Sequence, residues 1–231
     1  MDFLPNPGKN LIRKVGSEQW LRYPIKTRFI TEQDSLDEIL AQHILPFLEK
    51  GDIVVLGQKI ISLLQKRIVY KKDIKVGRCA RFLSKFATKT PAGFSVGNPL
   101  KMQVAINLAG LPRILFAGLL GAISKVFGQE GNFYRLAGHQ ISQIDGFYDR
   151  AFSQYGQIGI LGPVKCDELC QELKTKYGYS FLIVDINDLD GNILGRSSDL
   201  KGKEKLFLEI LKDNPAGQLA QQTPILILRQ Q

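Results

Sequence analysis

The sequence contains few of the residues that mark disulfide-rich, zinc-binding or secreted proteins. Its 231 residues include three cysteines, two histidines and one tryptophan. An odd number of cysteines cannot all pair within one chain, and the spacing of Cys166 and Cys170 is not that of a zinc knuckle, so we expect reduced core thiols. The first residues, MDFLPNPGKN, lack the basic-then-apolar layout of a secretory signal. This favours a cytoplasmic location.

Long hydrophobic runs are also missing. The most apolar run, ILFAGLLGAI at positions 114–123, has ten residues, about half of the ~20 that a transmembrane helix needs. We therefore predict a buried core helix there and no membrane partner. An apolar content of 44% and a charged content of 23% are typical of a globular protein with a sizeable core.

Several well-known catalytic motifs are absent from the sequence. It has no Walker A pattern, no dinucleotide-binding GxGxxG and no HExxH. A nucleotide, if the chain binds one, must be held by a less common loop.

Acidic residues are scarce in one part of the chain. Between Lys59 and Lys101 there are eleven basic residues and one acid, Asp73, so this segment has a net charge of +10. The whole chain has a net charge of +9, so the remaining residues sum to about −1. Such a segment attracts anions such as phosphates, nucleotides or acidic substrates, although a solvated basic surface is the alternative interpretation. The segment has no recognisable RNA- or DNA-binding motif, which argues against a nucleic-acid partner.

Hydrophobic periodicity predicts a mixed α/β fold, of the α+β type, with one mixed-sheet domain over residues 1–231 and a bilobed arrangement left open. Ser35 and Glu38 suggest a capping box for the first predicted helix, and Asp167 and Gly178 suggest the start and stop of the last. The predicted helices lie within 34–52, 99–128 (broken near Pro112) and 166–178, and the predicted strands within 52–64, 67–71, 179–188 and 223–228.

The segment FLIVDINDLDGNILG, residues 181–195, places five oxygen-bearing side chains after a buried strand. They form either a site for a cation or a turn rich in Asp and Asn, and the spacing excludes an EF-hand. A second carboxylate, Asp145, lies in an apolar and aromatic setting with His139 nearby. If Asp145 and Asp185 converge, they form a two-carboxylate site for Mg²⁺ or Mn²⁺ of the kind that phosphoryl chemistry uses.

Four segments in order resemble the coenzyme F-420-0:γ-glutamyl ligase family. GDIVVLGQKIISLLQKRIV resembles the early family strand and places Lys59, Ser62 and Arg67 on family positions. AGHQISQIDGFY places Asp145 on a metal-binding aspartate, ILGPVKCDELC keeps the Pro and Asp of a third motif, and LIVDINDLDGNILG places Asp185 on the second metal-binding aspartate and Gly195 on the final glycine.

The resemblance implies an amide ligase that uses GTP and Mg²⁺ or Mn²⁺, forms an acyl phosphate on a substrate carboxylate, adds glutamate to it, and assembles as a homodimer. It implies metal binding by Asp145 and Asp185 and phosphate or substrate binding by Lys59, Ser62 and Arg67, to which we add His139 because of its position. The expected substrates are a nucleotide, glutamate and an anionic acceptor. The sequence departs from the family motifs at Gln65, which replaces an acidic residue, and at Phe147 and Tyr148, which replace Ser and Asn. A repurposed member that binds a nucleotide or a phosphorylated metabolite without catalysis is therefore the alternative.

Overall fold

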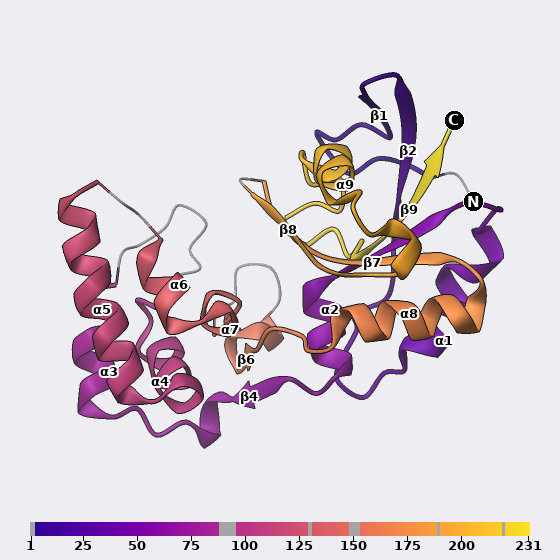
Figure 1. The fold of residues 1–231 in the computed structure, drawn as a ribbon. Helices are drawn as coiled ribbons and strands as arrows, with labels where there is room; N and C mark the ends of the chain where they lie inside the picture. Colours follow the sequence, from indigo (N-terminus) through magenta and orange to yellow (C-terminus); the bar gives the residue numbers. More distant parts are fainter. Residues whose placement is uncertain (1–2, 88–95, 129–130, 148–152, 189, 219) are drawn as a thin grey trace. The chain divides into compact units, whose positions relative to one another are not determined.

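The computed structural model describes residues 3–87, 96–128, 131–147, 153–188, 190–218 and 220–231. The chain divides into two compact units: unit 1 contains residues 1–67 and 163–231, and unit 2 contains residues 68–162. Both units combine helices with strands (Figure 1), which confirms the predicted mixed α/β class. That all 231 residues form one ligase-like domain stays a prediction.

Unit 1 is built on a six-stranded sheet with the order β1-β2-β9-β3-β7-β8. The central strands β3 and β7 run parallel, and the other neighbouring strands run antiparallel. The strands are β1 (Ile12–Val15), β2 (Glu18–Ile25), β3 (Ile53–Gly57), β7 (Ser180–Ile186), β8 (Gly191–Arg196) and β9 (Ile225–Gln230).

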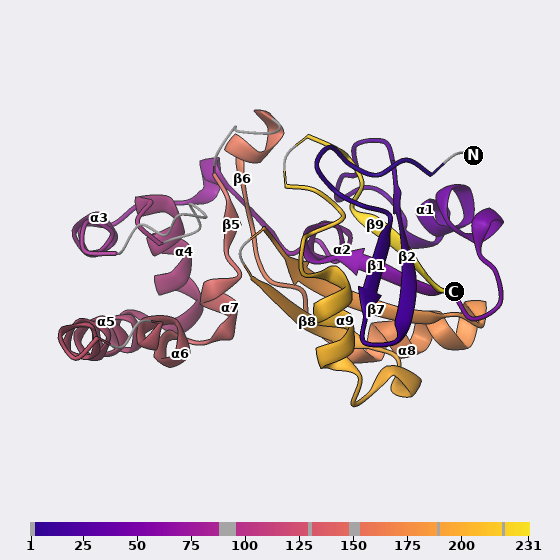
Figure 2. The same cartoon turned by 90° about the horizontal axis from the view of Figure 1, so that it is seen from above.

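Helices cover both faces of this sheet (Figures 1 and 2). Because side chains alternate along a strand, Val54 and Leu56 of β3 enter one core, while Ile53 and Val55 enter the other. The first core is closed by α1, α2 and α8, and the second by α9. The helical elements of unit 1 are α1 (Leu36–His43), η1 (Leu45–Phe47), α2 (Gln58–Leu64), α8 (Cys166–Tyr177), η4 (Ser198–Leu200) and α9 (Glu204–Leu211).

Unit 2 has a small antiparallel sheet with the order β4-β6-β5 and a core of its own. Its strands are β4 (Ile68–Tyr70), β5 (Asp145–Gly146) and β6 (Ile158–Ile160). Its helical elements are η2 (Lys71–Asp73), α3 (Arg78–Leu83), α4 (Pro99–Ala109), α5 (Leu111–Val126), α6 (Asn132–Ala137), α7 (His139–Ser142) and η3 (Ser153–Gly156).

Most of the predicted elements are confirmed, but three expectations are wrong in part. The predicted strand over residues 52–64 is β3 followed by the helix α2, because a short apolar run such as IISLL fits either structure. Asp167 is not the N-cap of α8, since Lys165 precedes the helix in the left-handed conformation. Ser35 is the N-cap of α1 but makes no side-chain capping hydrogen bond.

The predicted core helix within 114–123 is also only half correct. It lies in α5. The chain breaks between α4 and α5 at Gly110, two residues before the break expected at Pro112. Ile114 and Ala117 are buried, whereas Leu115, Phe116, Leu119 and Ile123 are exposed. The run is apolar on every side of the helix, but the described part of unit 2 buries one side of it and leaves these four side chains exposed.

Candidate active site

Asp185 lies near the carboxyl end of β7, beside the end of its parallel partner β3. Gly57, the last residue of β3, pairs with Val184 of β7. The next residue of each segment, Gln58 at the start of α2 and Asp185 on β7, therefore lies at the same edge of the sheet. With its amide nitrogen turned toward Asp185, the buried Gln58 donates to both carboxylate oxygens, at 2.7 and 3.2 Å. Ligands of open α/β sheets commonly bind at this edge, so Asp185 is placed where a ligand-binding carboxylate is expected.

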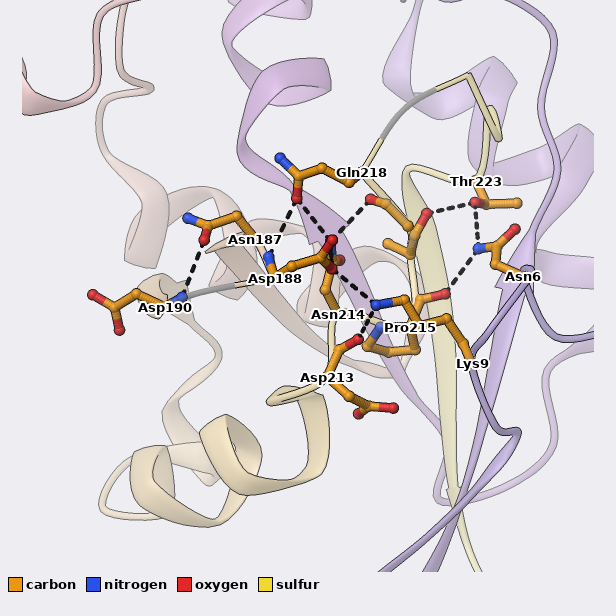
Figure 3. Close-up of polar contacts among 12 residues, drawn as sticks. Asn6, Lys9, Asn187, Asp188, Asp190, Asp213, Asn214, Pro215, Gln218 and Thr223 are labelled. Atoms are coloured by element: carbon orange, nitrogen blue, oxygen red, sulfur yellow. Dashed lines mark hydrogen bonds and ion pairs between the residues drawn. The ribbon is translucent and has the colours of Figure 1, made fainter. Parts of the chain in front are cut away.

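The acidic residues after Asp185 are used in a turn. The Asp190 main-chain N–H donates to Asn187 Oδ1 at 3.0 Å (Figure 3). The Asn187 N–H donates to the Asp190 carbonyl at 3.0 Å, and the Gly191 N–H donates to Asp190 Oδ1 at 2.7 Å. These are the local hydrogen bonds that favour Asp and Asn in turns. For Asn187 and Asp190 the structure therefore agrees with the turn interpretation.

Asp188 is held by side chains from two distant segments of unit 1. Lys9 Nζ lies 2.8 Å from Asp188 Oδ1 and also donates to the Asp213 carbonyl at 2.6 Å (Figure 3). The amide of the buried Asn214 donates to the same Asp188 oxygen at 3.3 Å. A lysine ammonium thus compensates this carboxylate, and within the described ranges no group of three or more His, Cys, Asp or Glu side chains is arranged to hold a metal ion. Of the acidic residues in this segment, Asp185 remains the candidate ligand.

Three further predicted residues lie on α2 or directly after it, in the same unit as Asp185. Lys59 is half-buried in the first turn, and Ser62 is fully buried one turn later. Its hydroxyl has no hydrogen-bond partner within the described residues. Arg67 follows the left-handed Lys66, and its main-chain N–H donates to the Ser62 carbonyl at 2.8 Å. The structure therefore brings Lys59, Ser62 and Arg67 into one helix and turn that begins beside Asp185.

The hydrogen bonds of Gln65 give a structural reason for one departure from the family motif. Its Nε2 donates to the Val164 carbonyl at 2.8 Å, and its Oε1 accepts from the Val164 N–H at 2.9 Å. An amide can donate and accept in this way, whereas an ionised carboxylate can only accept. In this chain, position 65 fastens the segment leaving unit 1 to the segment that returns to it.

Asp145 belongs to unit 2, where a lysine that the sequence analysis did not connect with it lies close by. Lys101 of α4 is only 2% exposed, and its Nζ is 4.0 Å from Asp145 Oδ1. Two opposite charges in a largely apolar core compensate each other, and removing either would leave the other buried. The site in unit 2 therefore combines a carboxylate with a built-in ammonium group.

The remaining candidates are settled in part. Asn98 is the N-cap of α4, and its side chain accepts from the Leu100 N–H at 2.8 Å. The side chain of His139 lies outside the described part of the chain, so its role stays a prediction. Burial raises the pKa of the Cys166 thiol to about 11 and also raises that of Cys170, as expected for protonated core thiols.

The model of the F420-0:Gamma-glutamyl ligase family matches residues 24–142. This is more than half of the chain. The chain belongs to the F420-0:gamma-glutamyl ligase family. The matched range contains Lys59, Ser62 and Arg67 and ends before Asp145 and Asp185. No curated protein matches the chain. As a family of ligases, the F420-0:gamma-glutamyl ligases act on small molecules.

Proposed function

We propose that this family member is a divergent metal- and nucleotide-dependent amide ligase. It joins the amino group of glutamate to a small phosphorylated carboxylate, with F420-0 as the reference acceptor. Family membership supports the reaction class, and the basic segment between Lys59 and Lys101 is suited to anionic substrates. The observation that carries the proposal is the position of Asp185, which is oriented by Gln58 at the end of the parallel strands β3 and β7 and lies in the same unit as Lys59, Ser62 and Arg67.

The donor set fits Mg²⁺ or Mn²⁺. Both are hard cations that prefer oxygen ligands, and Mg²⁺ is often bound by only one or two carboxylates, with water and substrate phosphates completing the shell. Asp185 would provide one of these carboxylates; Asp145, which Lys101 compensates in unit 2, stays the predicted second ligand. When bound, the metal ion would neutralise charge on the nucleotide phosphates.

The residues of the chain would act mainly by binding and orientation. Lys59 and Arg67 would bind phosphate and carboxylate groups, and the buried Ser62 hydroxyl would donate a hydrogen bond to one of them. In the proposed reaction the substrate carboxylate oxygen attacks the γ-phosphorus of GTP, which gives an acyl phosphate and GDP. The glutamate amine then attacks the acyl carbon, phosphate leaves, and the amine loses a proton.

The test is turnover by the purified chain with GTP or ATP, Mn²⁺, glutamate and F420-0, followed by mass spectrometry of the acceptor. We expect a product heavier by one or more glutamate residues. Asp185→Asn and Asp145→Asn should each weaken Mn²⁺-dependent nucleotide binding by about tenfold or more, since each removes a charged ligand. Asp190→Asn is the matched control, because it removes an acid of the same segment that serves the turn. Unchanged nucleotide binding in both variants would refute the site assignment.

A non-catalytic, repurposed member is the second candidate, and Phe147 favours it. The family motif has a polar Ser here, whereas Phe147 is buried in the core of unit 2, with its ring against Gly159 and a φ angle of 57°. Metal-dependent stabilisation by a nucleotide without any product would support this candidate over the ligase. The homodimer implied by the family resemblance also stays a prediction, which light scattering during gel filtration would test.

A further inference from the structure

The helix α5 exposes a continuous apolar stripe. Leu115, Phe116, Leu119 and Ile123 are 48%, 57%, 63% and 47% exposed. Their spacing of one, four and eight residues from Leu115 places them on one face of the helix, opposite the buried Ile114 and Ala117. We call these four residues the α5 stripe. Contiguous exposed apolar surface of this kind usually marks an interaction site.

The α-helices of unit 2, α3 to α7, carry basic residues and no acids. From Ile74 to Gln129 the sequence contains eight Lys or Arg and no Asp or Glu. On α3 and directly after it, the exposed Arg81 and Lys85 lie beside the exposed aromatic rings of Phe82 and Phe86, whose centroids are 5.0 Å apart. Exposed Arg113 and Lys125 lie near the two ends of the stripe on α5 itself. The charged residues of α5 itself are therefore both basic, and we call Arg113 and Lys125 the basic rim of the stripe.

This charge favours one kind of occupant. Residues 68–162 contain twelve basic and four acidic residues, a net charge of +8, so two copies meeting through this face would bring like charges together. An anionic lipid surface offers negative headgroups for the rim and an acyl boundary for leucine and phenylalanine side chains. A nucleic acid would complement the rim but would leave the aliphatic side chains in water.

Helix lengths restrict how such contact can occur. No single helix among the described residues is long and apolar enough to cross a membrane. The helices α4 and α5 have sufficient length and apolar composition only as a pair, and the chain bends by 115° between them. The exposed apolar face of α5 is the part that could contact the acyl boundary of a lipid surface.

We propose that the α5 stripe, with its basic rim, binds unit 2 to the surface of an anionic phospholipid bilayer. The test is flotation of the full chain with vesicles of phosphatidylcholine containing phosphatidylglycerol, compared with vesicles of phosphatidylcholine alone. We expect binding to the anionic vesicles that is at least about tenfold tighter and weakens as salt is raised. Equal binding to both vesicle types, or no binding to either, would overturn the proposal.

Variants distinguish the contribution of the α5 stripe to vesicle binding from that of the net positive charge. Leu119→Glu and Leu115→Glu should each weaken vesicle binding by at least about tenfold. Each removes an apolar side chain that would enter the acyl boundary and replaces it with a carboxylate that stays hydrated. Leu4→Glu is the matched control: it makes the same chemical change at an exposed leucine of unit 1 and should bind vesicles as the parent does. If Leu4→Glu weakens binding as much as Leu119→Glu, net charge alone explains the effect and the stripe assignment is wrong.

Two further measurements test insertion of the stripe and its competing occupant. In Phe116→Trp, vesicles containing brominated lipid should quench the new tryptophan, whereas Trp20 is buried in unit 1 and gives the background signal in the parent chain. Absence of additional quenching in the variant would refute insertion of the stripe. Light scattering identifies the competing occupant: if Leu119→Glu converts a dimer into a monomer, the stripe is a self-association surface and the lipid assignment is wrong.

Discussion

Gln65 illustrates how one side chain can tie two distant segments together. Its amide makes complementary hydrogen bonds with both main-chain groups of Val164, which lies 99 positions later in the sequence. The acidic residue that the family motif has at this position would retain the acceptor and lose the donor. At this position the divergence from the family has a local structural reason.

Gln65→Glu should therefore destabilise unit 1. The variant places a carboxylate oxygen against the Val164 carbonyl and leaves that carbonyl without its donor, so we expect a loss of about 1–3 kcal/mol in the free energy of unfolding. Urea unfolding followed by the fluorescence of Trp20, the sole tryptophan of the chain and part of the unit 1 core, measures this loss. Gln33→Glu makes the same change at an exposed position and serves as the control. A variant as stable as the parent would show that the hydrogen bonds with Val164 contribute little.

Lys101 shows how a residue is missed when its partner is remote in sequence. In the sequence it is one of the eleven residues of the basic segment, whereas the structure buries it on α4 beside Asp145. The position of Lys101 within a predicted helix does not reveal that its partner is on a strand more than forty residues later in the sequence. The signal that was available is a lone lysine in a helix with no other charged residue.

At the level of elements, Gly195 marks the closest approach of α8 to the sheet. A Cβ atom at position 195 would lie 2.4 Å from the carbonyl carbon and from the Cβ of Cys166. These atoms belong to the first residue of α8, so the helix would have to shift away from β8. The final glycine of the family motif therefore has a packing role in this chain.

Gly195→Ala should destabilise unit 1 by about 1–3 kcal/mol, as expected for overpacking against a backbone that cannot move freely. Unfolding in urea monitored by Trp20 fluorescence measures the change. Gly118→Ala in α5 is the control, because a Cβ there has no neighbour within 4 Å and alanine favours a helix. Equal stabilities of Gly195→Ala and the parent would mean that α8 adjusts at little cost.

The elements that the sequence predicted well are those whose packing is simple. Strands β3, β7 and β9 are short apolar runs with helices on both faces, and such runs are easily recognised. Strand β2, with the sequence EQWLRYPI, was not predicted, because it carries a charged residue, Arg22, that unit 1 buries and pairs with Asp213. Asp185 was found because an acid after a buried strand is conspicuous, whereas Gln58 became relevant only through its contact with Asp185.

At the scale of the whole molecule, unit 2 is an insertion into unit 1. Residues 68–162 leave after Arg67 and return at Pro163, and the hydrogen bonds between Gln65 and Val164 hold the two connecting segments of unit 1 together. Unit 1 therefore has its own core and a closed connection at the insertion point. Its charge is small, because +8 of the total of +9 lies in residues 68–162.

A chain in which residues 68–162 are replaced by a short Gly-Ser linker should fold cooperatively. We expect a single urea transition of Trp20 fluorescence, since both cores of the six-stranded sheet are retained. The same deletion with Gln65→Ala should be less stable, because the remaining connection is weakened. A non-cooperative or absent transition in the deleted chain would show that unit 1 needs unit 2 to fold.

The strand order of unit 1 also has a consequence during synthesis on the ribosome. Strand β3 ends at residue 57, while its neighbours β7 and β9 begin at residues 180 and 225. At about 5–20 residues per second, β7 is translated about 6–25 s after β3. Residues 68–162 are translated during this interval and can fold first. Throughout it, the apolar strand β3 has no neighbouring strand on either edge. The nascent chain is therefore expected to need protection, by a chaperone or by slow elongation, until its last residues have left the exit tunnel.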